Sequence, residues 1–220
     1  MVLLSRPARV MVAATVGYGL GTVLFADVAT RMVRRRQPQD TEVHATASGN
    51  PGAANAMAQL GKRWGALVLA GDMGKGAAAA QIGRAIGGDA GAYAAATAAV
   101  AGHCFPPFRG FRGGKGVATS AGTTWVVFPI YAPVDVGLAA LSFLVSRHAA
   151  KATLFASTAF VGSAILWNRR RWPGLWGARP SVGLPLYAAA TTAMIALRFA
   201  NWPPPPRQAA AEPAEAARAA

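Results

Sequence analysis

Long apolar segments alternate with short polar connections along most of this 220-residue chain. The first apolar stretch, residues 10–28, is about as long as the roughly 20 residues that span a bilayer as a helix. It leads to Arg34, Arg35 and Arg36, and it lacks the small residues of a signal-peptide cleavage site. We therefore expect a first transmembrane helix that stays in the protein.

Six more apolar segments follow, and several of them are shorter than a straight bilayer span. Pro129 and Pro133 interrupt residues 117–145, which predicts two short helices rather than one long helix. The other four segments are residues 64–86, 90–101, 152–167 and 182–197. Short or broken helices occur at membrane depth where they line a polar cavity. The pattern predicts an all-α, polytopic integral membrane protein with about seven short transmembrane helices.

The composition agrees with a membrane location. Hydrophobic residues make up 53% of the chain and charged residues 14%, against about 25% charged residues in soluble domains. The net charge of +14 lies in the connections and ends, as is typical of basic loops that set membrane topology beside anionic lipid. The same charge could attract anionic substrates. Because the basic residues form no single stripe with interleaved aromatics, we expect no nucleic-acid partner.

The charge of the connections also predicts on which side of the membrane each one lies. The basic ones are residues 31–63, 102–119 and 147–151. They share one side of the membrane if seven helices alternate from an outside N-terminus, and that side is then cytoplasmic. The connections near Asp89 and Asp135 carry little positive charge and fall on the other side. The same count places the arginine-rich residues 168–179 on the outer side, against the statistical rule, so either one segment is miscounted or this connection is an exception.

Residues 201–220 are rich in Pro and Ala, a composition typical of disorder. We expect one membrane domain over residues 1–200, followed by this disordered tail. Cys104 is the only cysteine, so no internal disulfide can form. His44 and His148 are isolated in the sequence, and we expect neither a metal ion nor a cofactor.

The strongest candidate for chemistry is the glycine-rich basic stretch GHCFPPFRGFRGGKGVAT, residues 102–119. Glycine lets backbone amides approach a ligand closely, while a lysine and a following helix N-terminus add positive charge. The groups predicted to cradle a phosphate are Arg112, Gly113, Gly114, Lys115 and Gly116. The stretch is not a Walker A loop, because it lacks that motif's first glycine and its Ser or Thr. It therefore favours phosphate binding without ATP or a metal ion.

Two further motifs carry polar groups. Ser48, Asn50 and Asn55 lie in SGNPGAAN, which a loop with a helix N-cap would also explain. Asp72 and Lys75 are three residues apart, so they share a helix face. Ionisable groups inside a membrane segment are functional candidates, and a mutually neutralising structural pair is the alternative.

Two basic side chains complete the candidate set. Lys62 follows the first motif near the same predicted membrane face. His103, at a predicted helix end, is either a general base or a hydrogen-bonded structural residue.

With these motifs in this order, the chain resembles the PlsY family of acyl-phosphate:glycerol-3-phosphate acyltransferases. The family patterns S-G-N-x-G-A-T-N, D-x-x-K-G and G-H-x-F-P-x-F-x-G-F-K-G-G-K-G-V-A-T correspond to residues 48–55, 72–76 and 102–119. The resemblance implies a multi-pass protein of the bacterial cytoplasmic membrane with a polar active-site pocket facing the cytoplasm. It implies transfer of a fatty acyl group from acyl phosphate to the 1-hydroxyl of glycerol 3-phosphate, which gives lysophosphatidic acid for phospholipid biosynthesis.

The residue chemistry suits that reaction. Both substrates carry phosphate, and an acyl phosphate has a good leaving group, so catalysis can rest on positioning and charge stabilisation without a covalent nucleophile. We assign catalytic roles to Ser48, Lys115 and His103. We assign phosphate binding to Asn50, Asn55, Lys62, Lys75, Arg112, Gly113, Gly114 and Gly116, with Asp72 as a structural partner. The expected partners are the two substrates and the lipid bilayer, and no protein partner is implied.

The chain departs from the family pattern in two places that bear on turnover. Ala58 stands where the family usually has Arg, ten residues after the first motif's Ser, and Ala54 replaces a Thr. The family's R-H-x-x-N segment has its nearest counterpart in residues 198–201, RFAN, which lack the His. The sequence thus leaves a second hypothesis, a silent homologue that binds phosphate or lipid. A small anion transporter is a third hypothesis, which the specific glycine-rich match disfavours.

Overall fold

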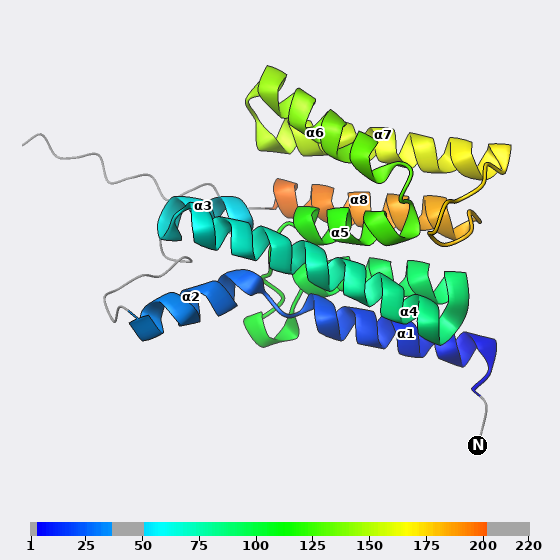
Figure 1. Ribbon diagram of the computed structural model, residues 1–220, viewed down its shortest axis with the longest axis horizontal. Helices are drawn as coiled ribbons and strands as arrows, with labels where there is room; N and C mark the ends of the chain where they lie inside the picture. Colours follow the sequence, from blue (N-terminus) through cyan, green and yellow to red (C-terminus); the bar gives the residue numbers. More distant parts are fainter. Residues whose placement is uncertain (1–3, 37–50, 202–220) are drawn as a thin grey trace, which may run out of the picture.

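The computed structural model describes residues 4–36 and 51–201, and within them all regular structure is helical. The helices are α1 (Arg6–Gly21), α2 (Phe25–Arg36), α3 (Ala53–Leu60), α4 (Lys62–Cys104), α5 (Val117–Val127), α6 (Ala132–Ser146), α7 (Ala149–Arg170) and α8 (Gly183–Ala200), with a 3-10 turn at Pro107–Arg109. Figure 1 shows the long helices lying side by side in one bundle. Ser48, Asn50 and almost all of the predicted tail lie outside the described residues.

The long α4 is two antiparallel helices that reverse at Gly88, where φ is 66° and ψ is −154°. Such a left-handed backbone conformation favours glycine. A Cβ atom on Gly91 would collide with the carbonyl oxygen of Gly83, so the two halves touch backbone to backbone beside the turn. The reversal is visible at the right end of α4 in Figure 1. The two segments predicted at residues 64–86 and 90–101 are therefore both present.

The first predicted membrane segment, residues 10–28, lies within a stretch long and apolar enough to cross a membrane, but a break that the sequence did not predict divides its helix. α1 ends at Gly21 and α2 begins at Phe25. The N–H of Thr22 bonds back to the carbonyls of Tyr18 and Gly19, and its Oγ1 also donates to Gly19. The break leaves the carbonyl of Val23 outside the helical ladder, where it accepts a hydrogen bond from Lys75.

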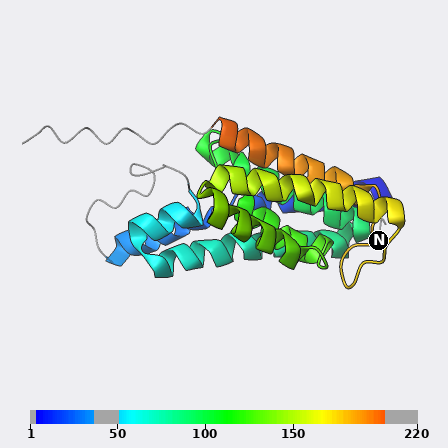
Figure 2. The same cartoon turned by 90° about the horizontal axis from the view of Figure 1, so that it is seen from above.

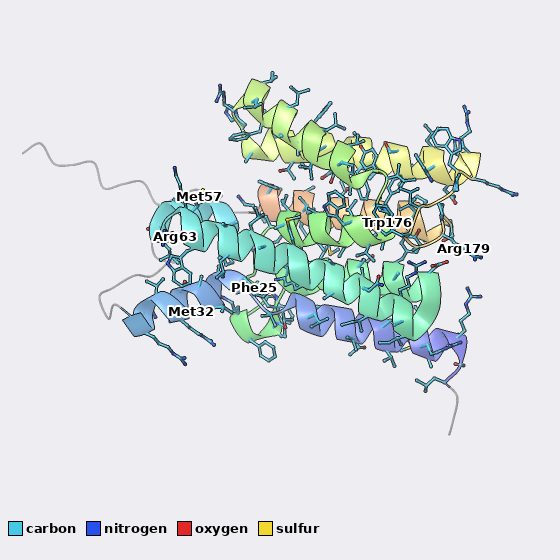
Figure 3. All side chains as sticks on the ribbon, viewed as in Figure 1. Phe25, Met32, Met57, Arg63, Trp176 and Arg179 are labelled. Carbon is cyan, nitrogen blue, oxygen red and sulfur yellow. The ribbon has the colours of Figure 1, made fainter. Side chains whose placement is uncertain are left out.

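The remaining segments agree with the predicted pattern. Residues 117–145 do form two helices, α5 and α6, separated at Phe128–Tyr131. Among the described residues, three stretches are long and apolar enough to cross a membrane: Arg6–Arg35, Ala149–Arg170 and Gly183–Ala200. Large apolar side chains also cover the outside of the bundle (Figure 3). Examples more than half exposed are Leu141, Phe155 and Leu186, a distribution that suits contact with lipid.

The interior is built from small residues and one aromatic cluster. α1 approaches α4 so closely that a Cβ atom on Gly17 or Gly21 would collide with the backbone of Ala95 or Ala99. On the other side of α4, aromatic rings from four segments pack together as Tyr93, Phe128, Tyr131, Phe160 and Tyr187. This packing fixes the second half of α4, which carries His103 at its end.

The α7–α8 connection and the reversal of α4 lie at one end of the bundle, and the glycine-rich loop lies toward the other, beside the junction of α1 and α2 (Figures 1 and 2). The glycine-rich loop lies on the side of α2, because Arg109 pairs with Asp27 of α2. The α7–α8 connection lies at the opposite end, where the carbonyl of Trp176 accepts a hydrogen bond from Arg84, close to the Gly88 turn. The glycine-rich loop and residues 168–179 thus lie toward different ends of the bundle, as the count of segments placed them, and which end faces the cytoplasm stays a prediction.

Candidate active site

Three ionisable side chains meet inside the bundle beneath the glycine-rich loop. Asp72 and Lys75 come from the first half of α4, and His103 comes from the last turn of the second half. All three are buried, with exposures of 1%, 7% and 3%. The Lys75 Nζ lies 2.7 Å from Asp72 Oδ1 and 2.8 Å from His103 Nδ1. The reversal at Gly88 brings these residues together although 28 positions separate Lys75 from His103.

Lys75 makes its hydrogen bonds inside the protein. Its Nζ also donates to the carbonyl oxygen of Val23 at 2.6 Å. The ammonium thus has hydrogen-bond contacts with Val23 and His103 and an ion pair with Asp72, although Asp72 Oδ1 accepts no hydrogen bond within the described residues. This geometry differs from the expectation that Lys75 contacts substrate phosphate, because the side chain is buried and its ammonium contacts three groups of the protein. It matches the alternative of a structural pair, with the backbone of the α1–α2 break added to it.

The contacts of His103 assign its protons. With Lys75 as an ammonium, which can only donate, His103 Nδ1 is the acceptor of this contact and the ring proton of a neutral His103 lies on Nε2. That Nε2 faces Gly114, where a Cβ atom would collide with it. His103 is 3% exposed, and its Nε2 carries a proton and is covered by the loop. The geometry therefore fits a structural residue under the loop better than the general base that the sequence left open.

The glycine-rich loop is held by the end of α4. The N–H groups of Gly113 and Gly114 donate to the carbonyls of Cys104 and His103, at 3.1 and 3.0 Å. These carbonyls belong to the last turn of a helix, where they lack intrahelical partners. A side chain at Gly113 would collide with the His103 carbonyl. The two glycines thus allow close packing of the loop on α4, and their amides point into the protein rather than toward a ligand.

Arg198 of α8 fixes the outer side of the same loop, a role that sequence reasoning missed. Its Nη2 donates to the carbonyl of Gly113 at 2.7 Å and its Nε to the carbonyl of Gly114 at 3.2 Å. One guanidinium therefore spans two consecutive peptide groups, as its planar fork allows. The only sequence signal was its place in the RFAN segment, residues 198–201.

Lys115 follows the two anchored glycines and is half-buried. Its Nζ lies 4.5 Å from the centre of the Phe199 ring, a cation–π contact. Burial lowers the pKa of Lys115, and the neighbouring charge of Arg198 lowers that pKa further. Two cations are thus brought close together at the loop, an arrangement that a bound anion would stabilise.

The N-terminus of α5 lies directly after Lys115. Gly116, with φ of 83°, caps the helix, and a Cβ atom there would come within 2.8 Å of Cys104 Sγ. The first amides of a helix have no intrahelical acceptor, and the helix dipole makes this end positive. In the first turn, the buried Thr119 Oγ1 has no hydrogen-bond partner in the described part of the chain. Lys115 and this helix end are the groups that keep the predicted phosphate-binding chemistry.

Two contacts tie the loop to the N-terminal helices. Arg109 Nη1 binds both carboxylate oxygens of Asp27, at 2.5 and 2.6 Å. The hydroxyl of Tyr18 donates to the carbonyl of Phe105 at 2.7 Å. Together with Arg198, they fix the loop from α1, α2 and α8.

The other predicted site residues are less closely connected to this centre. Asn55 is buried in the first turn of α3. Lys62 is exposed at the first position of α4, about 20 Å along the helix axis from Lys75 at 1.5 Å per residue. Arg112 is exposed on the loop. Ser48 and Asn50 lie outside the described residues.

Comparison with known proteins gives consistent matches over most of the chain. The family profile described as glycerol-3-phosphate acyltransferase matches residues 11–203. A relative named glycerol-3-phosphate acyltransferase from Rubrobacter xylanophilus is 38% identical, with 70% of this chain and 84% of the relative covered. A relative of the same name from Maricaulis maris is 41% identical, with 72% and 71% covered.

The fold also matches solved structures. A crystal structure of PlsY (YgiH), described as an integral membrane glycerol 3-phosphate acyltransferase in its glycerol 3-phosphate form, aligns with a TM-score of 0.71 at 27% identity. The alignment covers 87% of this chain and 88% of that one. The lysophosphatidic acid form of the same protein aligns with a TM-score of 0.69 at 27% identity, covering 86% and 87% of the two chains.

Proposed function

The chain belongs to the glycerol-3-phosphate acyltransferase family, and from this premise we propose that it acylates glycerol 3-phosphate with an acyl phosphate as donor. The oxygen of the 1-hydroxyl attacks the acyl carbonyl carbon, and the bond from that carbon to the phosphate oxygen breaks. The products are lysophosphatidic acid and inorganic phosphate, with the hydroxyl proton taken up by the leaving phosphate. The reaction belongs to phospholipid biosynthesis.

In the structure of this chain, the proposal rests on one observation. Lys115 and the N-terminus of α5 adjoin each other and provide two kinds of positive group for substrate phosphates. Because acyl phosphate already contains a good leaving group, the protein needs chiefly to hold two anionic substrates together and to stabilise developing charge. Ser48, Asn50 and Asn55, Lys62 and Arg112 stay in the proposal as further polar contacts from the surrounding connections.

The buried groups support this site from beneath. We place Asp72, Lys75 and His103 among the residues that position the loop, because they contact one another and the loop glycines. Gly113 and Gly114 belong with them as close-packed positions, while Gly116 caps the N-terminus of α5. The acyl chain can stay in the bilayer while its phosphate end reaches Lys115.

A second candidate function is a homologue that binds phosphate or lipid without turnover. Two departures favour it. Ala58 replaces the Arg that the family pattern implies, and it is exposed on α3. Phe199 follows Arg198 where the pattern has His, and its ring holds Lys115. A phenyl ring can neither exchange a proton nor hydrogen-bond a phosphate as a histidine can.

The experiment tests whether acyl phosphate is the acyl donor. Purified protein is given glycerol 3-phosphate with either an acyl phosphate or the matching acyl thioester, and lysophosphatidic acid is measured by mass spectrometry. We expect product with the acyl phosphate and at least about tenfold less with the thioester, equivalent to 1.4 kcal/mol in the barrier. Equal rates would contradict the donor assignment, and binding of glycerol 3-phosphate without product would favour the silent homologue.

A further inference from the structure

An open cavity of about 740 Å³ lies in the α7–α8 connection, at the end of the molecule opposite the glycine-rich loop. Its lining includes Asn168, Arg169, Arg171, Trp172, Arg179 and Pro180. The proposed acyl transfer uses none of these residues. The proposed acyl transfer therefore does not explain this cavity.

The connection around the cavity is an ordered structure. The Nε1 of Trp167 donates to the carbonyl of Pro173 at 3.2 Å, which closes the turn after α7. From α4, the hydroxyl of Tyr93 donates to the carbonyl of Arg179 at 3.1 Å, and Arg84 donates to the carbonyl of Trp176. Hydrogen bonds from two parts of α4 thus hold the cavity walls in place before any ligand binds.

The cavity is strongly positive. Arg169, Arg171 and Arg179 are exposed, and within residues 4–36 and 51–201 no carboxylate forms an ion pair with any of them. Asp89, at the same end of the bundle, pairs with Arg84 instead. The dipole of α7 favours basic residues at its C-terminus, but it explains only Arg169 to Arg171. Arg179 comes from the far side of the connection.

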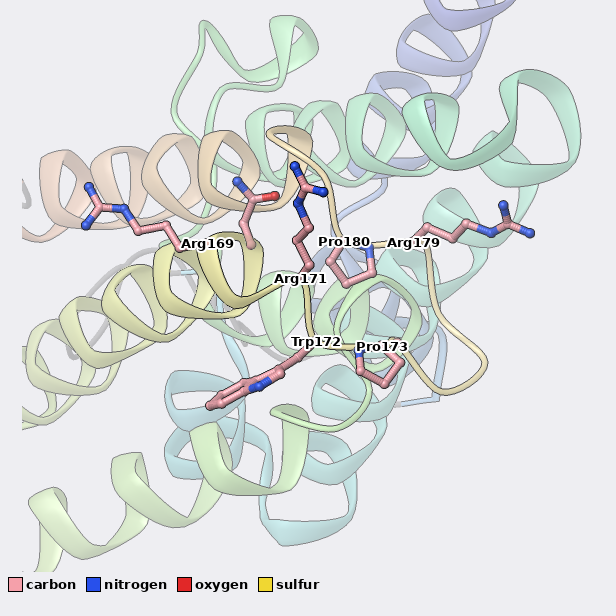
Figure 4. A pocket seen from close by; sticks show the side chains of 8 residues that line it. Arg169, Arg171, Trp172, Pro173, Arg179 and Pro180 are labelled. Carbon is pink, nitrogen blue, oxygen red and sulfur yellow. The ribbon is translucent and has the colours of Figure 1, made fainter.

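The arrangement of the arginines indicates the size of the ligand. Figure 4 shows Arg171 in the middle, with Arg169 and Arg179 extended to either side. The three guanidinium groups are spread apart, so one small anion would contact few of them, whereas a phospholipid headgroup with its glycerol and phosphate oxygens is extended. Trp172 and Trp176 are 40% and 63% exposed beside the cavity, and exposed tryptophans are typical of the membrane–water interface.

We propose that this cavity binds the headgroup of an anionic phospholipid in the leaflet opposite the proposed active site. Arg171 forms charge-assisted hydrogen bonds to the phosphate, with Arg169 and Arg179 at the two sides of the headgroup. The exposed Trp172 and Trp176 of the same connection lie at the membrane–water interface beside the headgroup. The bound lipid supplies the negative charge that the described part of the protein does not provide for this connection.

The test compares two neighbouring arginines in the full-length protein. Arg171 lines the cavity, whereas Arg170 carries the same charge in the same turn and is absent from the lining. Delipidated protein is titrated with phosphatidylglycerol or phosphatidylcholine, and bound lipid is counted by native mass spectrometry. We expect Arg171→Gln to weaken phosphatidylglycerol binding about tenfold or more, the effect of losing a hydrogen bond between charged groups. Arg170→Gln should change it less than about twofold.

Equal weakening of phosphatidylglycerol binding in Arg171→Gln and Arg170→Gln would overturn the proposal, because it indicates diffuse charge. Equal affinity of the parent protein for phosphatidylcholine and phosphatidylglycerol would also overturn it. So would displacement of the lipid by equimolar inorganic phosphate, which indicates a free-anion site. Arg179→Gln is a second variant from the other side of the cavity, with the same expected loss. The thermal unfolding midpoint of each variant verifies the fold, and acyl transfer is expected to be unchanged because the cavity lies at the opposite end.

Discussion

The buried position of Lys75 gives a prediction that separates structural support from substrate binding. In Lys75→Met, the Asp72 carboxylate, which is 1% exposed, loses the ammonium at 2.7 Å. Removing one partner of a buried ion pair costs about 3–5 kcal/mol, because the other charge stays buried without compensation. At about 2–4 °C per kcal/mol for a chain of this size, the unfolding midpoint should fall by about 6–20 °C.

The double variant Asp72→Asn/Lys75→Met removes both charges. The double variant still loses about 1–3 kcal/mol of stability, because the carbonyl of Val23 has no donor. The amide introduced by Asp72→Asn can donate to His103 Nδ1, which lies 3.5 Å from Asp72 Oδ1. We therefore expect the double variant to be more stable than Lys75→Met and to regain most of the acyl transfer, with an unchanged KM for glycerol 3-phosphate.

The assay measures thermal unfolding and steady-state kinetics on the same detergent preparations. Lys151→Met, an exposed lysine at the start of α7, is the matched control and should leave both unchanged. The reasoning fails if the double variant regains stability but keeps a strongly raised KM. That result would mean that Lys75 binds substrate phosphate directly.

Three further predictions concern the loop and α3. Lys115→Ala should raise the KM for glycerol 3-phosphate or acyl phosphate about tenfold or more with little change in stability. Because the pKa of Lys115 is lowered, its ammonium loses its proton early as pH rises. The KM of the parent should therefore rise at alkaline pH, whereas the KM of Lys115→Arg should stay constant. The lysine in Arg198→Lys cannot span the carbonyls of Gly113 and Gly114. We therefore expect kcat/KM to fall about tenfold and hydrogen exchange of the Gly113 and Gly114 amides to accelerate. Unchanged hydrogen exchange would contradict the positioning role of Arg198. Ala58→Arg should raise activity about ten- to a hundredfold, whereas no gain over a fast parent would show that Lys62 or Arg63 already supplies this charge.

Much of the fold follows from local patterns in the sequence. Apolar runs and prolines predicted the segments, and the count of segments placed the glycine-rich loop and residues 168–179 toward different ends. The break at residues 22–24 was not predictable, because an apolar run does not reveal which of its carbonyls is used by a distant side chain. Here the carbonyl of Val23 binds Lys75, 52 positions away.

The site was predictable in its residue types but not in their partners. The spacing of Asp72 and Lys75 predicted a shared helix face, and the structure confirms their ion pair. The third member, His103, joins them only through the reversal at Gly88. Glycines in the loop suggested amides that face a ligand, yet two of these amides bond to the end of α4. Glycine permits close approach to a ligand and to another backbone segment equally well.

The most direct test of the central claim is product formation by the purified protein with acyl phosphate and glycerol 3-phosphate. Lysophosphatidic acid is measured by mass spectrometry and released phosphate by a colorimetric assay in the same reaction. The account predicts the two products in a one-to-one ratio, with the rate strongly reduced in Lys115→Ala and unchanged in Lys151→Met. Phosphate release without lysophosphatidic acid, or equal rates in the parent and Lys115→Ala, would contradict it.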